Sequence, residues 1–430
     1  ARLSSASAHT MTRPRSLSGA NTALRVPITS LAEPRAPYPH AREVAMLRAH
    51  QARCAALIGG YARTAEAQAL VRSGWAHDIV AGRAVVRART PRVVALDDTG
   101  YADERDPAAR TARLPSIALR AARSSLEAGA PVLVQVPRRG YVPSLACARC
   151  RTIARCRHCT GPLALAESSQ QGGATLVCRW CGRTEPTRRC ARCGSEAVRA
   201  VVVGARRTAE ELGRAFPGTA VVTSSGDGVV PEVAAGPALV VATPGAEPAA
   251  SGGYGAALLL DTWALLGRQD LRAAEDALWR WMSAAALVRP RGDGGVVLAV
   301  AESSIPTVQS LIRWDPVGHA AADLAARTEV GLPPSVHMAA LDGAADAVAA
   351  LLEESGLPED ADVLGPVDLP AGVRRPAGTP PGVPVTRMLV RARREQGLAL
   401  AAGLRRGVSV LSARQTHEPV RVQIDPLHIG

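Results

Sequence analysis

The chain has 430 residues, 47% hydrophobic and 3% aromatic, with a formal net charge of +13 at pH 7. This length predicts about three domains, and the absence of a run of about 18 uncharged apolar residues argues against a membrane span. All 51 basic residues are arginine, so this chain cannot supply the lysine with which a P-loop binds nucleotide phosphates. Excess arginine favours phosphate-bearing partners, and nucleic acid above all.

The N-terminal part of the chain gives weak signals. Residues 1–30 lack periodicity and are expected to be disordered, and the start at Ala rather than Met suggests a truncated or misassigned beginning. A helix is predicted at 41–55, with Val44, Leu47 and Cys54 on its buried side, and a second helix at 64–73.

The middle of the chain alternates strands and helices, which predicts an α/β sheet. Strands are expected at 85–89, 92–96, 131–136, 197–203, 220–223, 238–242, 256–260 and 296–301. Helices are expected at 114–127, 208–216, 270–288 and 305–314. Thr208 is the expected N-cap of its helix, with Glu211 in the capping-box position. The apolar run 131–136 is typical of a buried parallel strand.

A third unit follows the break at Leu332-Pro333-Pro334. It is predicted to be a small α+β domain with an antiparallel sheet. Its strands are expected at 336–341, 386–391 and 420–424, its helices at 344–354 and 395–406, and a loop at 365–384.

Four CxxC pairs lie close together between the first strands of the α/β region. They are Cys147/Cys150, Cys156/Cys159, Cys178/Cys181 and Cys190/Cys193. Four thiolates complete a tetrahedral structural zinc site, so eight predict two Zn²⁺ ions per chain. A disulfide framework is the alternative, but such frameworks are typical of short secreted domains and no signal peptide is recognisable here.

The spacing favours a nested arrangement of the two zinc sites. The gap between Cys159 and Cys178 is close to zinc-ribbon spacing, which groups Cys156, Cys159, Cys178 and Cys181 into an inner site. The outer site is then formed by Cys147, Cys150, Cys190 and Cys193. A sequential pairing is the alternative, although it makes the chain reverse within the five residues between Cys150 and Cys156.

Several motifs together resemble the PriA family of primosomal replication-restart proteins, relatives of superfamily 2 helicases. Besides the four CxxC pairs, the resemblance rests on five segments: Tyr38-Pro39-His40-Ala41-Arg42-Glu43-Val44-Ala45, Arg138-Arg139-Gly140-Tyr141-Val142-Pro143, Leu332-Pro333-Pro334, Val363-Leu364-Gly365-Pro366-Val367 and Val422-Gln423-Ile424-Asp425-Pro426. The resemblance runs from about residue 33 to the C-terminus, and the cysteine block is its most specific part.

The resemblance implies an α/β fold: degenerate RecA-like helicase lobes with an inserted two-zinc Cys₄ module and a C-terminal α+β domain. The expected divisions are an atypical N-terminus at 1–31, a first-lobe remnant at 32–112, a second lobe at 113–146 and 195–318, the zinc module at 147–194 and the C-terminal domain at 319–430. The family's N-terminal DNA-binding domain and most of its first lobe have no counterpart in this sequence, and its motor motifs are degenerate here.

The implied function is recognition of stalled or abandoned replication forks and scaffolding of helicase reloading, without helicase activity. The implied partners are forked or single-stranded DNA, primosome proteins and single-stranded-DNA-binding protein, in the cytoplasm and with no membrane. Arg138, Arg139 and Tyr141 are the candidate DNA contacts, because they follow a sheet strand and Tyr141 could stack on a base. Packing against the zinc module is the alternative role for Arg139 and Tyr141.

Two other functions fit parts of the sequence. One is an ATP-dependent 3′→5′ DNA helicase, against which the absence of lysine argues. The other is a zinc-ribbon protein of transcription or RNA metabolism, which would prefer RNA to forked DNA.

Overall fold

The computed structural model describes most of the chain from residue 38 onward. The described residues are 33, 36, 38–96, 113–137, 145–150, 152, 154, 156–157, 163–165, 176–178, 183–185, 189–199, 205–226, 228–268, 270–369, 373–415 and 418–428. The chain divides into two compact units: one holds residues 79–319, and the other combines the N-terminal part up to Asp78 with residues 320–430.

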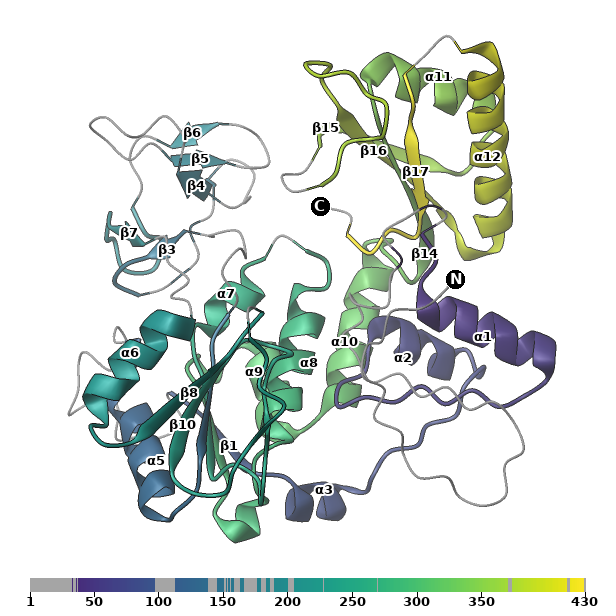
Figure 1. Ribbon diagram of the computed structural model, residues 1–430. Helices are drawn as coiled ribbons and strands as arrows, with labels where there is room; N and C mark the ends of the chain where they lie inside the picture. Colours follow the sequence, from purple (N-terminus) through teal and green to yellow (C-terminus); the bar gives the residue numbers. More distant parts are fainter. Residues whose placement is uncertain are drawn as a thin grey trace. The chain divides into compact units, whose positions relative to one another are not determined.

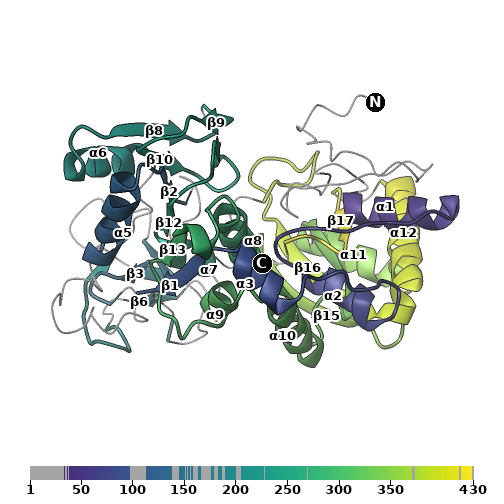
Figure 2. The ribbon, with the colours of Figure 1, turned by 90° about the horizontal axis from the view of Figure 1, so that it is seen from below.

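A six-stranded parallel sheet forms the centre of unit 79–319 (Figures 1 and 2). The strand order is β1-β13-β12-β2-β10-β8. The strands are β1 (Arg92–Ala95), β2 (Val132–Gln135), β8 (Ala220–Ser224), β10 (Ala238–Ala242), β12 (Ala256–Leu259) and β13 (Val296–Ala299). β2 and β12 are buried along their whole length, as parallel strands covered on both faces require.

Helices cover both faces of this sheet (Figure 2). On one face, α5 (Ser116–Glu127) and α6 (Ala205–Ala215) pack through Ala118 and Leu212 onto a core that includes Val134 of β2. The other face carries α7 (Thr262–Leu266), α8 (Ala273–Ala285) and α9 (Pro306–Arg313). Short elements complete the unit: α3 (Arg83–Arg89), η2 (Arg291–Asp293), β9 (Glu232–Val233) and β11 (Ala249–Ala250).

Two expectations for this unit need correction, and a third is only partly described. Residues 85–89 belong to helix α3, so the predicted strand is wrong. The two valines favour a strand locally, but this segment pairs with no strand of the described sheets. Helix α6 begins at Ala205, so Thr208 is inside it and is not its N-cap. Of the predicted strand 197–203, residues Val198–Arg199 form strand β7, which pairs with β3 (Ala146–Cys147) next to the cysteines, and residues 200–203 lie outside the described residues.

The second unit contains a four-stranded antiparallel sheet in the order β15-β16-β14-β17 (Figure 1). Its strands are β14 (Val336–Gly343), β15 (Asp362–Asp368), β16 (Thr386–Arg393) and β17 (Arg421–Ile424). Helices α11 (Ala345–Ser355) and α12 (Gly397–Arg414), the latter preceded by η3 (Arg394–Gln396), pack on the sheet through Val348, Leu351, Leu400 and Leu404. β15 overlaps the start of the predicted 365–384 loop.

A buried carboxylate joins three strands of this sheet. Asp342 of β14 has no exposed surface, and its Oδ1 accepts a hydrogen bond from Arg387 Nε of β16 at 2.7 Å. Arg421 Nε of β17 donates to Asp342 Oδ2 at 3.1 Å. Two guanidinium groups therefore compensate one fully desolvated charge.

The N-terminal helices of this unit are α1 (Ala41–Ala52) and α2 (Ala65–Arg72). Leu47 is 56% exposed and Cys54 is exposed, so the predicted buried side of the first helix is wrong; only Ala49 of α1 is buried. Helix α10 (Pro316–Glu329), which the sequence pattern did not predict, contains the boundary between the two units.

The mixed α/β fold, with a parallel sheet and a C-terminal antiparallel sheet, is confirmed. The RecA-like lobes and the domain limits derived from the resemblance stay predictions. No helix in the described part of the chain is both long enough and apolar enough to cross a membrane.

Candidate metal centre

The cysteines follow the carboxyl end of β2, the central strand of the parallel sheet. Residues 145–199, here called the Cys module, contain β3 (Ala146–Cys147), β4 (Leu163–Leu165), β5 (Leu176–Cys178), β6 (Thr184–Glu185) and β7. β3 and β7 form an antiparallel pair in which Cys147 lies opposite Val198. This pairing brings the two ends of the module together, and with them the first and last CxxC pairs.

The first and last pairs have the same local sequence, Cys-Ala-Arg-Cys, and each is held by backbone hydrogen bonds. The amide of Cys147 donates to the carbonyl of Thr152 at 2.8 Å, and the amide of Cys190 donates to the carbonyl of Ser195 at 2.9 Å. Gly194 follows Cys193 with a φ of +70°, a conformation that glycine adopts without the usual steric cost. Each turn directs both of its sulfurs to the same side.

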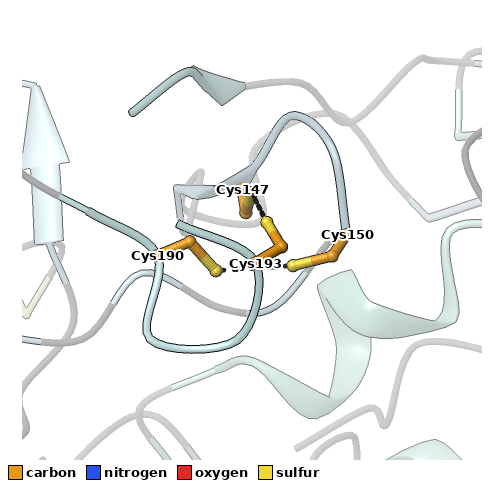
Figure 3. Close-up of side chains that lie close together, drawn as sticks. All are labelled: Cys147, Cys150, Cys190 and Cys193. Atoms are coloured by element: carbon orange, nitrogen blue, oxygen red, sulfur yellow. Dashed lines mark hydrogen bonds between the residues drawn. The ribbon is translucent and has the colours of Figure 1, made fainter. Parts of the chain in front are cut away.

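Cys147, Cys150, Cys190 and Cys193 converge on one point (Figure 3). Their four sulfurs all lie within 4.8 Å of one another. The Sγ atoms of Cys147 and Cys193 are 3.5 Å apart, and those of Cys150 and Cys190 are 3.4 Å apart. Tetrahedral Zn–S bonds of about 2.3 Å place sulfurs about 3.8 Å apart. The four residues therefore fit a tetrahedral thiolate-bound metal ion with small adjustments.

The thiols also differ in acidity. Burial raises the pKa of Cys190, but hydrogen bonds from the backbone of Cys193 and Arg192 outweigh it and lower the pKa to about 6. A backbone hydrogen bond from Ser195 lowers the pKa of Cys193, but burial and the neighbouring sulfurs of Cys150, Cys147 and Cys190 raise it to about 11. Four thiolates at this spacing repel one another, so a bound cation is what would stabilise all of them in the ionised form.

An ion pair connects this centre to the parallel sheet. Arg192, between Cys190 and Cys193, donates from Nη1 to Glu302, which follows strand β13. The hydrogen bond to Glu302 raises the pKa of Arg192. Sequence reasoning missed this contact because the two residues are 110 positions apart, and no local pattern links them.

The predicted inner zinc site is only partly described. Cys156 is buried beside Leu145, Leu163 and Leu176 in a small apolar cluster. Cys178 ends strand β5, while Cys159 and Cys181 lie outside the described residues. This second quartet therefore stays a prediction.

The predicted DNA contacts Arg138, Arg139 and Tyr141 also lie outside the described residues. The Cys module contains further arginines whose side chains are exposed, namely Arg149, Arg157, Arg183, Arg189 and Arg192. Between residues 147 and 194 the sequence has nine arginines and two glutamates, a balance of +7. This charge favours contact with a polyanion.

Asp261, at the carboxyl end of β12, is part of an ion-pair network. Arg113 donates from Nε to its Oδ2 at 2.8 Å, and from its other nitrogens to Glu211 at 2.8 Å and to Thr208 Oγ1 at 2.6 Å. Asp261 adopts a φ of +50°, which is unusual for a non-glycine residue. The buried carboxylate of Asp261 is thus paired with the guanidinium of Arg113, and this ion pair accounts for its burial.

The comparisons with known proteins agree with the motifs. The family described as "Primosomal protein N C-terminal domain" matches residues 328–427, which include the whole antiparallel sheet. The chain is 80% identical over 400 residues to the "Probable replication restart protein PriA" of Mycobacterium leprae. It is also 80% identical over 408 residues to the protein of the same description in Mycobacterium tuberculosis.

The chain is similar to PriA proteins over most of its own length. Each of the two mycobacterial alignments covers 93% of this chain and 61% or 62% of the relative, so the chain spans less than two thirds of their length. The "Replication restart protein PriA" of Bacillus subtilis is 26% identical over 187 residues, 43% of this chain and 22% of that protein. The resemblance to the PriA family seen in the sequence is confirmed.

Proposed function

We propose that the chain is a DNA-binding component of replication restart that recognises stalled or abandoned forks and scaffolds helicase reloading. The observation that carries this proposal is the 80% identity to mycobacterial proteins described as probable replication restart protein PriA. DNA, primosome proteins and single-stranded-DNA-binding protein are the proposed partners. Neither the helicase alternative nor the RNA alternative has support in these findings.

Zinc is the proposed metal, with two ions per chain in the nested arrangement. Four convergent cysteine sulfurs support the outer site, since thiolate quartets of tetrahedral geometry are typical of structural zinc. The inner site, formed by Cys156, Cys159, Cys178 and Cys181, rests on the spacing of the cysteines. Because the described part of the Cys module has only one small apolar cluster, bound metal would supply much of its stability.

The Cys module is the proposed DNA-contacting part of the α/β unit. Its arginine excess supports this role, and Arg138, Arg139 and Tyr141 are proposed to extend the contact at the carboxyl end of β2. Phosphate contacts by arginine would give affinity, while stacking on Tyr141 would favour unpaired bases. ATP hydrolysis is not part of the proposal for this chain, because none of its 430 residues is lysine.

A binding comparison tests the proposal. The zinc-loaded chain is titrated into labelled forked, duplex and single-stranded DNA of equal length, and ATP hydrolysis is measured on the same samples. We expect the forked substrate to bind most tightly and hydrolysis to stay at background. Equal affinity for all three substrates would contradict fork recognition.

A further inference from the structure

A basic pocket lies at the amino-terminal edge of the parallel sheet, opposite the edge from which the Cys module extends. It has a volume of about 290 Å³ and is formed by α3, the start of β1, η2 and the end of α9. Five arginines line it: Arg83, Arg87, Arg92, Arg291 and Arg313. Backbone hydrogen bonds fix its walls, since Arg92 N donates to Gly295 O at 2.9 Å and Arg291 N donates to Thr90 O at 2.9 Å.

The five guanidinium groups make no ion pair with any carboxylate in the described part of the chain. Arg83 donates to the carbonyl of Arg313 at 2.7 Å, which ties α3 to the end of α9. Elsewhere in the chain, buried arginines such as Arg113 and Arg387 are paired with acids. All five arginines are exposed, so the concavity presents acid-free guanidinium groups to an anion from solution.

Beneath the arginines, the pocket is apolar. Pro91 and Val93 are buried there, with Ile312 and Trp314 beside them. The Nε1 of Trp314 is buried and has no hydrogen-bond partner among the described residues.

An arginine rim above an apolar and aromatic floor matches the chemistry of a single nucleic-acid strand. Phosphates repeat along such a strand and pair with guanidinium groups in bidentate geometry, while the faces of its bases pack on aromatic and apolar side chains. The volume is at the low end of the range for ligand sites, which suits one nucleotide rather than a duplex segment.

We propose that this pocket binds a phosphate and the adjoining nucleoside of single-stranded nucleic acid. The inference rests on the proposed DNA binding and adds a contact point on the side of the sheet away from the Cys module. The strand would be held at two separated points of the α/β unit. An acidic peptide presents similar charges and is the competing occupant that the test must separate.

The test uses the full zinc-loaded chain and a triple variant, Arg87→Gln/Arg291→Gln/Arg313→Gln. These side chains are exposed and make no hydrogen bond or ion pair with the described residues, so the fold should persist, which an unchanged thermal unfolding curve would verify. Binding of fluorescein-labelled oligo(dT) of about 20 nucleotides is measured by anisotropy at several salt concentrations. We expect at least a tenfold loss of affinity at low salt and a salt slope smaller by about 2 units.

The matched control is Arg120→Gln/Arg206→Gln/Arg214→Gln, which removes the same charge from the exposed sides of α5 and α6. Its affinity for oligo(dT) should be within about twofold of the affinity of the unchanged chain. If both triple variants bind equally well, the pocket proposal is wrong while DNA binding stands. If the unchanged chain binds forked DNA but not oligo(dT), the pocket proposal is wrong while fork binding stands; if it binds neither, both proposals fail.

Two further measurements distinguish the occupants. Oligo(dT) should quench tryptophan fluorescence, and Trp314→Phe should remove much of that quenching whereas Trp75→Phe should not. An acidic peptide that loses affinity for the pocket variant, while oligo(dT) retains it, would assign the pocket to a protein partner and overturn the proposal.

Discussion

The contribution of single residues is clearest at the outer cysteine quartet. The Sγ atoms of Cys190 and Cys150 are 3.4 Å apart, and the amide of Cys190 donates to the carbonyl of Ser195. Because these contacts fix the turn, neither Cys150 nor Ser195 can move easily to replace the sulfur of Cys190. Cys190→Ser should therefore reduce the zinc content by about one ion per chain, measured by a colorimetric thiol-release assay or by mass spectrometry under native conditions.

The ninth cysteine provides the matched control for this change. Cys54 is exposed and is not part of the quartet, so Cys54→Ser should leave the metal content unchanged. Retention of the full metal content by Cys190→Ser would show that the outer quartet does not hold an ion.

Among the secondary-structure elements, α12 extends beyond its predicted end. The sequence predicts a helix at 395–406, just before Gly407, and glycine weakens helix interiors. The helix continues to Arg414. A Cβ at Gly407 would lie 2.6 Å from the hydroxyl of Ser355, and one at Gly403 would lie 2.6 Å from the Ser355 carbonyl. These glycines allow α11 and α12 to approach closely, and that packing outweighs their low helix propensity.

The antiparallel sheet depends on the buried carboxylate of β14. Asp342→Asn would leave Arg387, which is only 2% exposed, without its charge partner. We expect the local unfolding free energy of β14 and β16 to fall by about 3–5 kcal/mol. Hydrogen exchange of their backbone amides, followed by mass spectrometry, measures this change.

An exposed ion pair of the same sheet is the control for Asp342→Asn. Arg393 and Asp360 are 3.0 Å apart, with side chains 69% and 49% exposed. Asp360→Asn should therefore change the same exchange rates by less than the equivalent of about 1 kcal/mol. If Asp342→Asn and Asp360→Asn had comparable effects, burial would not govern the contribution of Asp342 to the stability of the sheet.

In the whole molecule, the two units should respond differently to metal removal. The proposed metal sites lie in the unit 79–319, while the antiparallel sheet belongs to the other unit and has its own core. Treatment with a strong chelator should expose the Cys module to trypsin, which cleaves after arginine, and leave 336–424 protected. Peptide mapping by mass spectrometry locates the new cleavage sites.

The control for this experiment is chelator already saturated with zinc, which should change neither unit. Equal cleavage in the module and in 336–424 after chelation would indicate that the two units unfold together. Absence of new cleavage in the module would indicate that metal does not stabilise it.

The sequence by itself determined the features that depend on local pattern. Apolar runs predicted the buried parallel strands, because strands covered on both faces must be apolar throughout. Cysteine spacing predicted thiolate quartets, and the order of the motifs indicated the PriA family, which the comparisons confirm.

Tertiary structure alone decided the features that join distant residues. Arg192 meets Glu302, Arg113 meets Asp261, and Asp342 meets Arg387 and Arg421 across separations that no periodicity encodes. The basic pocket also joins distant residues, since its arginines come from segments about 200 positions apart in the sequence. Local pattern reports which face of an element is apolar, whereas the pairing of charges depends on which elements the fold brings together.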